Sequence, residues 1–212
     1  MKKILIIIVI ILIAVVVFRN VKNKENTTPT ITGMERETLE QREVISELEK
    51  GGYTLDTSVS DVSWKGSMGN IKSHTGTFAV QSGGLNVEDD RVIGGLNIDM
   101  NSVKSDSGGL DTHLKSADFF EVESFPISTF VITQLAGNNL TGDLTVKGIT
   151  NEITLPVIIS KTDNMVRLTG SFDFDRSKWD VRYGSSSFFD NLGNEAIDNI
   201  APLSIDLSFI QN

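Results

Sequence analysis

The feature that most constrains the fold is an alternation of apolar and polar residues that recurs eight times between residues 62 and 209. Ile98, for example, lies between the polar residues Asn97 and Asp99. Because successive side chains of a β-strand point to opposite faces, these segments are predicted to be antiparallel strands with one buried and one solvated face. The apolar lines are, in chain order, Val62 and Trp64; Phe78 and Val80, continuing from His74 and Gly76; Leu96, Ile98 and Met100; Phe130 and Ile132; Leu140, Gly142, Leu144 and Val146; Ile153, Leu155, Val157 and Ile159; Val166, Leu168, Gly170, Phe172 and Phe174; and Leu203, Ile205, Leu207 and Phe209.

An open sheet of eight such strands would expose one apolar face to water, so the sheet must fold over as a sandwich or close as a barrel. A closed barrel of eight strands has an interior that side chains just fill or that holds one small ligand. Three glycines lie on the inward lines, Gly76, Gly142 and Gly170. They are interpreted either as space left inside the barrel or as bends and bulges at its corners.

Two segments interrupt the strand pattern. The first precedes and includes "HLKSADFFEVESFPISTF" (113–130), in which Leu110 and Leu114 form an i,i+4 pair typical of a helix. We expect a short helical segment near 110–120, ended before Pro126. Its phenylalanines are predicted to close one end of the barrel. The second interruption, 176–202, is too long for a plain turn, and long structured loops are often functional.

The N-terminus carries 15 uninterrupted apolar residues, Ile4 to Phe18, after two lysines. As a helix they would span only about 22 Å, less than the roughly 30 Å of a bilayer core, so a signal-peptide core competes with a membrane anchor. The bulky residues 15–18 disfavour cleavage. We therefore expect an uncleaved signal anchor over 1–21, with the rest of the chain extracytoplasmic, on the periplasmic or cell-surface side, and secreted if cleavage does occur.

Residues 22–51 are predicted to be a polar linker and a helical stalk. Thr32 and Glu35 fit a capping box at the start of that helix, and Gly51 and Gly52 fit its end. The barrel domain is then expected to occupy residues 52–212.

Charge and composition exclude several classes of function. The net charge is −9, and no acidic residue precedes Glu25 whereas five basic residues do, so the remainder is still more acidic. Nucleic-acid binding is excluded because it needs clustered positive charge. The chain has no cysteine, which excludes disulfides, thiolate nucleophiles and thiolate metal sites. The common catalytic motifs are absent, so the chain is not expected to be an enzyme or to carry a metal or cofactor.

Several segments resemble the YceI-like family of bacterial exported proteins. They are "YTLDTSVSDVSWKGSMGNIKSHTGTF" (53–78), the 113–130 segment, "LTGDLTVKGITNEITLPV" (140–157) and "FDRSKWDVRYG" (174–184). The resemblance implies an extended lipocalin-like, eight-stranded antiparallel barrel that binds a polyisoprenoid chain, with export to the periplasm and, in some members, a homodimer. One departure is Leu110, which stands where many relatives carry an arginine before the aspartate that is Asp111 here.

The leading hypothesis is therefore an isoprenoid-lipid binding module, tethered by its N-terminal anchor, for extracytoplasmic storage or transport. A neutral quinone-like ligand is favoured over a prenyl phosphate because the domain is acidic. The alternatives are a ligand-free scaffold for interaction or envelope stress, and a hydrolase using the 175–182 cluster with Asp175 and Asp180. The predicted lumen residues are Trp64, Phe78, Val80, Ile98, Met100, Phe119, Phe120, Phe130, Ile132, Leu144, Val146, Leu155, Phe172 and Phe174, and the predicted head-group contacts are His74, His113, Arg176, Arg182 and Tyr183.

Overall fold

The computed structural model describes residues 48–212. The predicted anchor (1–21) and nearly all of the predicted linker and stalk (22–51) lie outside the described residues. Gly51, which the sequence suggested as the end of a stalk helix, instead begins the first strand. None of the helices in the described part of the chain is long and apolar enough to span a membrane.

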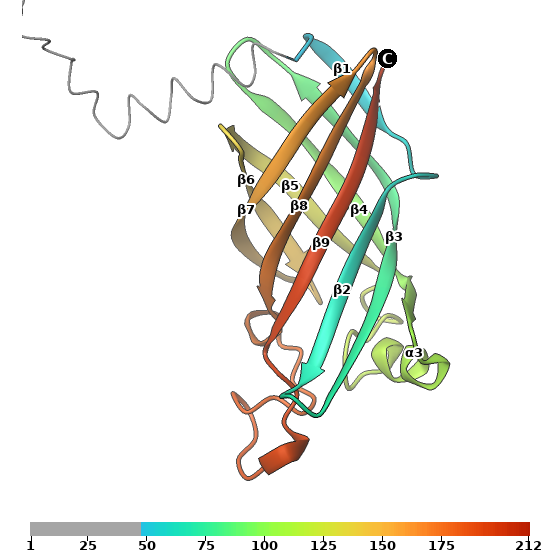
Figure 1. Cartoon of the computed structure of the whole chain (residues 1–212), viewed down its shortest axis with the longest axis vertical. Coiled ribbons are helices and arrows are strands. Elements are labelled where there is room, and N and C mark those ends of the chain that lie inside the picture. The colour runs from blue at the N-terminus through green and yellow to red at the C-terminus, as the bar shows by residue number, and fades with distance from the viewer. Residues whose placement is uncertain (1–47) are drawn as a thin grey trace, which may run out of the picture. The chain divides into compact units, whose positions relative to one another are not determined.

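The strands of residues 48–212 form one antiparallel sheet that closes on itself, as Figure 1 shows. Its strands are β1 (Gly51–Leu55), β2 (Asp61–Met68), β3 (Lys72–Val87), β4 (Val92–Ser105), β5 (Ile127–Ala136), β6 (Asn139–Val146), β7 (Ile149–Thr162), β8 (Met165–Asp175) and β9 (Ile200–Gln211). Neighbours along the chain pair from β2 through β9, and β2 pairs with β9 to close the barrel.

Strands β1 and β2 share one position in this barrel. Both pair with β3 and with β9, β1 at the end of the barrel that holds Val87 and β2 at the end that holds Lys72. The nine segments therefore make the predicted eight-stranded barrel. The break between β1 and β2 is held in place because the Asp56 amide donates to the Ser208 carbonyl at 2.8 Å and the Ser60 hydroxyl accepts from the Ser208 amide at 3.0 Å.

The inward lines predicted from the alternation form the core. At the β1 end the barrel is solidly packed, with Tyr53, Leu85, Leu140 and Phe209 all buried. Their polar neighbours along each strand face outward, as the alternating burial of β6 shows. The closed barrel thus buries its apolar side chains in its own interior, without a second sheet packed against it.

The inward glycines do not leave open space. A Cβ on Gly142 would lie 2.6 Å from the ring of Phe130, and one on Gly76 would lie 2.6 Å from an indole carbon of Trp64. A Cβ on Gly170 would collide with the Pro156 carbonyl. The interpretation of these glycines as lumen space is therefore wrong, because neighbouring rings and strands lie directly against them.

Helix α3 (Gly108–Lys115) confirms the short helix expected near 110–120, although it begins and ends earlier than expected. It stops because Ser116 is extended and its hydroxyl and amide both donate to the His113 carbonyl. The second interruption contains two 3₁₀ helices, η1 (Arg176–Trp179) and η2 (Gly193–Glu195). In Figure 1 α3 and this loop lie at the end of the barrel where β2 turns into β3.

Candidate ligand-binding cavity

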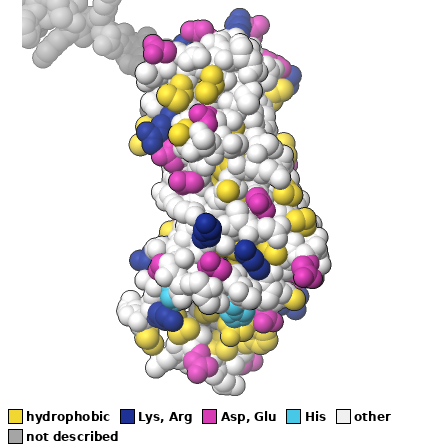
Figure 2. All heavy atoms as spheres, turned by 90° about the vertical axis from the view of Figure 1, so that its right-hand side faces the viewer, with side chains coloured by type: hydrophobic (Ala, Val, Ile, Leu, Met, Phe, Trp, Pro, Cys, Tyr) yellow, Lys and Arg dark blue, Asp and Glu magenta, His cyan; other side chains and the backbone are white. Residues whose placement is uncertain are grey.

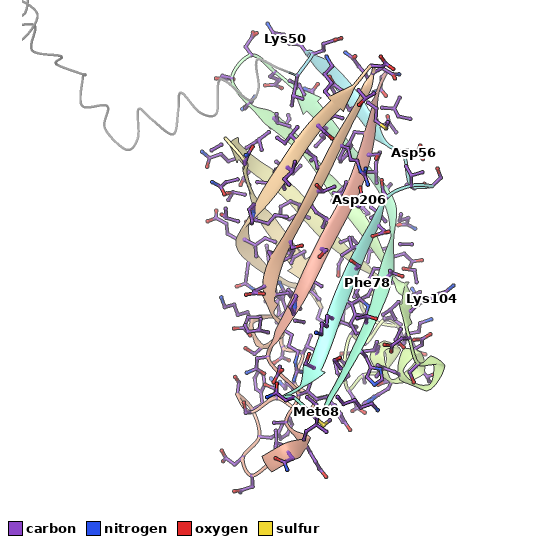
Figure 3. All side chains as sticks on the ribbon, in the orientation of Figure 1. Lys50, Asp56, Met68, Phe78, Lys104 and Asp206 are labelled. Carbon is purple, nitrogen blue, oxygen red and sulfur yellow. The ribbon has the colours of Figure 1, made fainter. Side chains whose placement is uncertain are left out.

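A cavity of about 310 Å³ occupies the half of the barrel next to α3 and the 176–199 loop. Each strand lines the cavity with its inward residues only down to a similar depth. Below that depth, side chains fill the interior of the barrel. On β5, for example, Ser128 lines the cavity but Phe130 does not, and on β3 Phe78 lines it but Val80 does not. Phe78 lies part-way along the barrel and Met68 at its loop end, so these two residues mark the direction from floor to mouth (Figure 3).

The inner wall of the cavity is almost wholly apolar. Its side chains come from β2, β4, β6, β8, β9 and α3 and from the segment after α3, and they include Val62, Trp64, Ile98, Met100, Leu110, Leu114, Phe119, Phe120, Leu144, Val146, Phe174, Ala201 and Leu203. Phe120 packs edge-on against Phe78, with ring centroids 5.7 Å apart. Such a surface offers dispersion contacts and few hydrogen bonds.

An aromatic cluster lies at the mouth. The His113 ring packs edge-on against Tyr183, with centroids 4.4 Å apart, and against Phe119 at 5.3 Å. Tyr183 is 44% exposed, so this cluster is the boundary between the apolar interior and solvent. It brings together α3, the turn after it and the 176–199 loop.

Arg176 organises that loop from within. It is 4% exposed, and its guanidinium donates to the backbone carbonyls of Asp198 (3.0 Å), Val181 (2.7 Å) and Ile197 (3.0 Å). Burial lowers the pKa of Arg176, and the charges of Asp175 and Asp198 oppose that effect. The buried guanidinium therefore ties three carbonyls of one loop together.

His74 lies on the β3 wall and is hydrogen-bonded at 2.6 Å through Nδ1 to Oδ1 of Asp106, the first residue after β4. The Thr75 amide donates to the other carboxylate oxygen at 3.1 Å. The hydrogen bond from His74 and that from the Thr75 amide lower the pKa of Asp106. The ring of His74 is thereby held in one orientation at the cavity wall.

Two buried polar atoms on the cavity wall have no hydrogen-bond partner within residues 48–212, Nε1 of Trp64 and Oγ of Ser128. Buried polar groups in folded proteins are nearly always paired. These two exceptions both border the same cavity.

Comparison with known proteins assigns the family. The sequence profile of the YceI-like domain matches residues 53–209, which is nearly the whole barrel. This chain belongs to the YceI-like family. The resemblance found in the sequence is thereby confirmed.

Relatives of this YceI-like chain include a UPF0312 protein of Shewanella denitrificans, 34% identical over 112 residues, which are 50% of this chain and 56% of the relative. A UPF0312 protein of Staphylococcus aureus is 45% identical over 56 residues, which are 26% of this chain and 33% of the relative. The matched part of this chain thus spans about half, or less, of the length of these relatives.

Two solved structures share the fold. Burkholderia cenocepacia BcnA aligns with a TM-score of 0.60 at 21% identity, covering 73% of this chain and 98% of BcnA. A polyisoprenoid binding domain from Saccharophagus degradans, implicated in plant cell wall breakdown, aligns with a TM-score of 0.61 at 17% identity, covering 76% and 98%. The lipocalin-like, eight-stranded architecture predicted for the YceI-like domain is therefore shown.

The structure divides the predicted lumen residues of this YceI-like domain into two groups. Nine border the cavity: Trp64, Phe78, Ile98, Met100, Phe119, Phe120, Leu144, Val146 and Phe174. The other five do not border it and pack beyond its floor or against the core: Val80, Phe130, Ile132, Leu155 and Phe172. The alternation predicted correctly which side chains point inward. It could not predict whether an inward side chain borders the cavity or packs against other side chains.

Four of the five predicted head-group residues line the cavity, namely His74, His113, Arg176 and Tyr183. The fifth, Arg182, does not; it pairs with Asp180 at 2.5 Å and lies 5.1 Å from the centre of the Phe188 ring. Although Arg176 borders the cavity, its guanidinium is engaged with loop carbonyls.

The carboxylates of the 175–182 cluster have structural partners. Asp175 accepts from the amide and the hydroxyl of Ser177 and caps η1, and Asp180 pairs with Arg182. Neither carboxylate borders the cavity. In the part of the chain that the structure describes, no group of three or more His, Asp or Glu side chains is arranged to hold a metal. The cluster thus gives the hydrolase alternative no support.

Several residues that line the cavity are not among those predicted from the sequence. Ser128 could have been found, since it lies two residues before Phe130 on the same inward line and is the one polar member of that line. Leu110 was noted only as a departure from relatives, yet its side chain contributes to the wall. Val181 and Ile197 come from the long loop, where no periodicity reveals which side chains turn inward.

Proposed function

We propose that this YceI-like barrel binds an isoprenoid-chain lipid in the cavity between its packed half and the 176–199 loop. The observation that carries the proposal is the apolar lining of a cavity of about 310 Å³ inside a closed barrel. Burying apolar surface contributes about 25 cal/mol per Å², so burying about 100 Å² of the isoprenoid already outweighs a single hydrogen bond of about 1 kcal/mol. The binding affinity would therefore come chiefly from the isoprenoid part of the lipid.

The ligand class is supported by the related fold from Saccharophagus degradans, which is described as a polyisoprenoid binding domain. The volume lies at the lower end of the roughly 300–1,000 Å³ typical of ligand cavities, which favours one short chain or one segment of a long chain. We further propose a neutral, quinone-like head group, because the domain is acidic and the guanidinium of Arg176 is engaged with backbone carbonyls.

The proposal also includes extracytoplasmic storage or transport of this lipid, with residues 4–18 as the membrane anchor and a homodimer as the assembly. The apolar run of the N-terminus supports the anchor. The exposed aromatic side chains Phe188 and Phe189, on the loop that borders the mouth, support exchange of an apolar ligand there.

The test is organic extraction of the purified full-length chain followed by mass spectrometry, together with uptake of a prenyl quinone from vesicles. A stoichiometric prenyl lipid, or saturable uptake, is expected. Val146→Phe would place a ring in the cavity and should reduce uptake. The matched control is Val131→Phe, because Val131 is 51% exposed on the outer face of β5. A chain that carries no lipid and takes up no quinone would refute the proposal and leave the ligand-free scaffold.

A further inference from the structure

Ser128 is a polar residue at an apolar floor. It is 2% exposed, and its hydroxyl has no hydrogen-bond partner within residues 48–212. It lies directly opposite Ile98 on β4 and is followed on the inward line of β5 by Phe130, which no longer borders the cavity. The hydroxyl is therefore at the deepest point that β5 contributes to the cavity.

Trp64 presents the second unpaired atom, its indole N–H. The residue lies opposite Gly76 on β3 and Leu203 on β9, and its ring covers Gly76. This contact fixes the ring against the wall, since the glycine leaves room for it and a Cβ there would collide with the indole. The indole nitrogen is a donor only, so it needs an acceptor.

The two atoms come from different walls of the barrel. Strands β3 and β4 lie between β2, which carries Trp64, and β5, which carries Ser128. Because this places β2 and β5 three positions apart in an eight-position barrel, both side chains point into one lumen from separated directions. A group inside the cavity can thus contact either residue.

Burying both polar atoms without hydrogen bonds destabilises the fold, and simple substitutions would avoid this. Alanine at 128 and phenylalanine at 64 would keep the strand pattern and the apolar packing while removing the orphaned groups. A buried polar group that no part of the fold uses is therefore informative.

We propose that Trp64 Nε1 and Ser128 Oγ each donate a hydrogen bond to an uncharged acceptor oxygen of the ligand, such as a carbonyl, at the inner wall of the cavity. This inference rests on the proposed function and specifies the class of lipid, one with a neutral oxygen on its inner part rather than a pure hydrocarbon or an anion. An anionic group would need a free cation, and the inner wall offers none among the described residues. The charged and titratable lining residues, Lys72, His74, His113, Arg176, Tyr183 and Asp198, come from the mouth end.

The test compares two probes that differ only in the acceptor: a benzoquinone with a short isoprenoid chain, and the benzene with the same substituents but no carbonyl oxygen. The chain has two tryptophans, so the full-length protein gives two indole N–H signals, which Trp64→Phe assigns. We expect the quinone to move the Trp64 signal downfield. The Trp179 signal should stay in place, because that indole already donates to the Leu144 carbonyl at 3.0 Å.

Ser128→Ala and Trp64→Phe are each expected to weaken quinone binding roughly five- to tenfold and to leave hydrocarbon binding within about twofold. Trp179→Phe is the matched control, which removes an indole N–H outside the cavity and should affect both probes alike. Equal affinities of the two probes, with no loss in Ser128→Ala, would overturn this inference and leave the proposed function intact. If neither probe binds the natural chain, the proposed function fails and this inference with it.

Discussion

The ring of Phe130 on β5 lies against the backbone of Gly142 on β6, so closely that a Cβ on Gly142 would come within 2.6 Å of the ring. The two residues are diagonal neighbours, since Phe130 pairs with Leu144 and Gly142 with Ile132. Phe130 fills the interior just beyond the cavity, and the glycine makes room for it. The packing of the cavity floor thus depends on glycine at position 142.

Gly142→Ala is expected to destabilise the barrel by about 1–3 kcal/mol, because the added methyl would meet both the Phe130 ring and the Val131 carbonyl oxygen at 2.5 Å. Urea unfolding of the full-length chain measures the change. Gly109→Ala in α3 is the control; nothing lies within 4 Å of its Cβ position, so stability should be unchanged or higher. Equal effects of the two substitutions would show that the contact with Phe130 carries no strain.

Arg176→Met is expected to loosen the 176–199 loop. Its backbone carbonyls at 181, 197 and 198 would lose their charged donor, for a cost of roughly 3–5 kcal/mol if they stay buried. Hydrogen exchange over the loop and the unfolding free energy should both report the loss. The control is Arg182→Met, whose exposed pair with Asp180 contributes little. Unchanged exchange in Arg176→Met would contradict the organising role of this guanidinium.

Much of the barrel could be predicted from the sequence because the face of a strand to which each side chain points follows from local alternation. The period-two pattern gave the inward face of β2 through β9, and the pair Leu110 and Leu114 indicated α3. Strand β1 was missed because Gly51 and Gly52 fit a helix end as well as a strand start. Its short pattern did not show that it shares one barrel position with β2.

The extent of the cavity could not be predicted, because it depends on packing across the barrel. Val80 and Phe78 alternate identically on β3, yet only Phe78 borders the cavity. Likewise Arg176 and Arg182 are both basic residues of one segment, and only the path of the loop decides that Arg176 is buried among carbonyls. Contacts between residues far apart in sequence determine both outcomes.

Acid is expected to lower the stability of the barrel by protonating Asp206 on β9, which pairs with Arg167 on β8. Nε of Arg167 donates to Oδ1 of Asp206 at 2.6 Å. The hydrogen bond and charge of Arg167 lower the pKa of Asp206, against an opposing effect of partial burial. A carboxylate with a lowered folded pKa contributes its full stabilisation above the unfolded value of about 3.9 and loses it as pH falls through the lower folded value.

Asp206→Asn should therefore be less stable than the natural chain at neutral pH and should lose less stability below about pH 4. Unfolding free energies measured across that range test both expectations. The control is Asp173→Asn on β8, because Asp173 is exposed and has no ion pair among residues 48–212. Parallel pH curves for the natural chain and Asp206→Asn would rule out this linkage.

The exposed aromatic side chains of the 176–199 loop, which borders the mouth of the cavity, are expected to control the rate of ligand exchange rather than affinity. Phe188 and Phe189 are 39% and 49% exposed, and Figure 2 shows hydrophobic side chains gathered near the histidines at this end. Phe188→Ser with Phe189→Ser should slow transfer of a prenyl quinone from vesicles severalfold, since the apolar path into the cavity is lost. Equilibrium affinity should stay the same, because neither ring lines the cavity. Stopped-flow transfer measures the rate, with Ile158→Ser on the outer face of β7 as the control; a rate unchanged in the double variant would exclude this route.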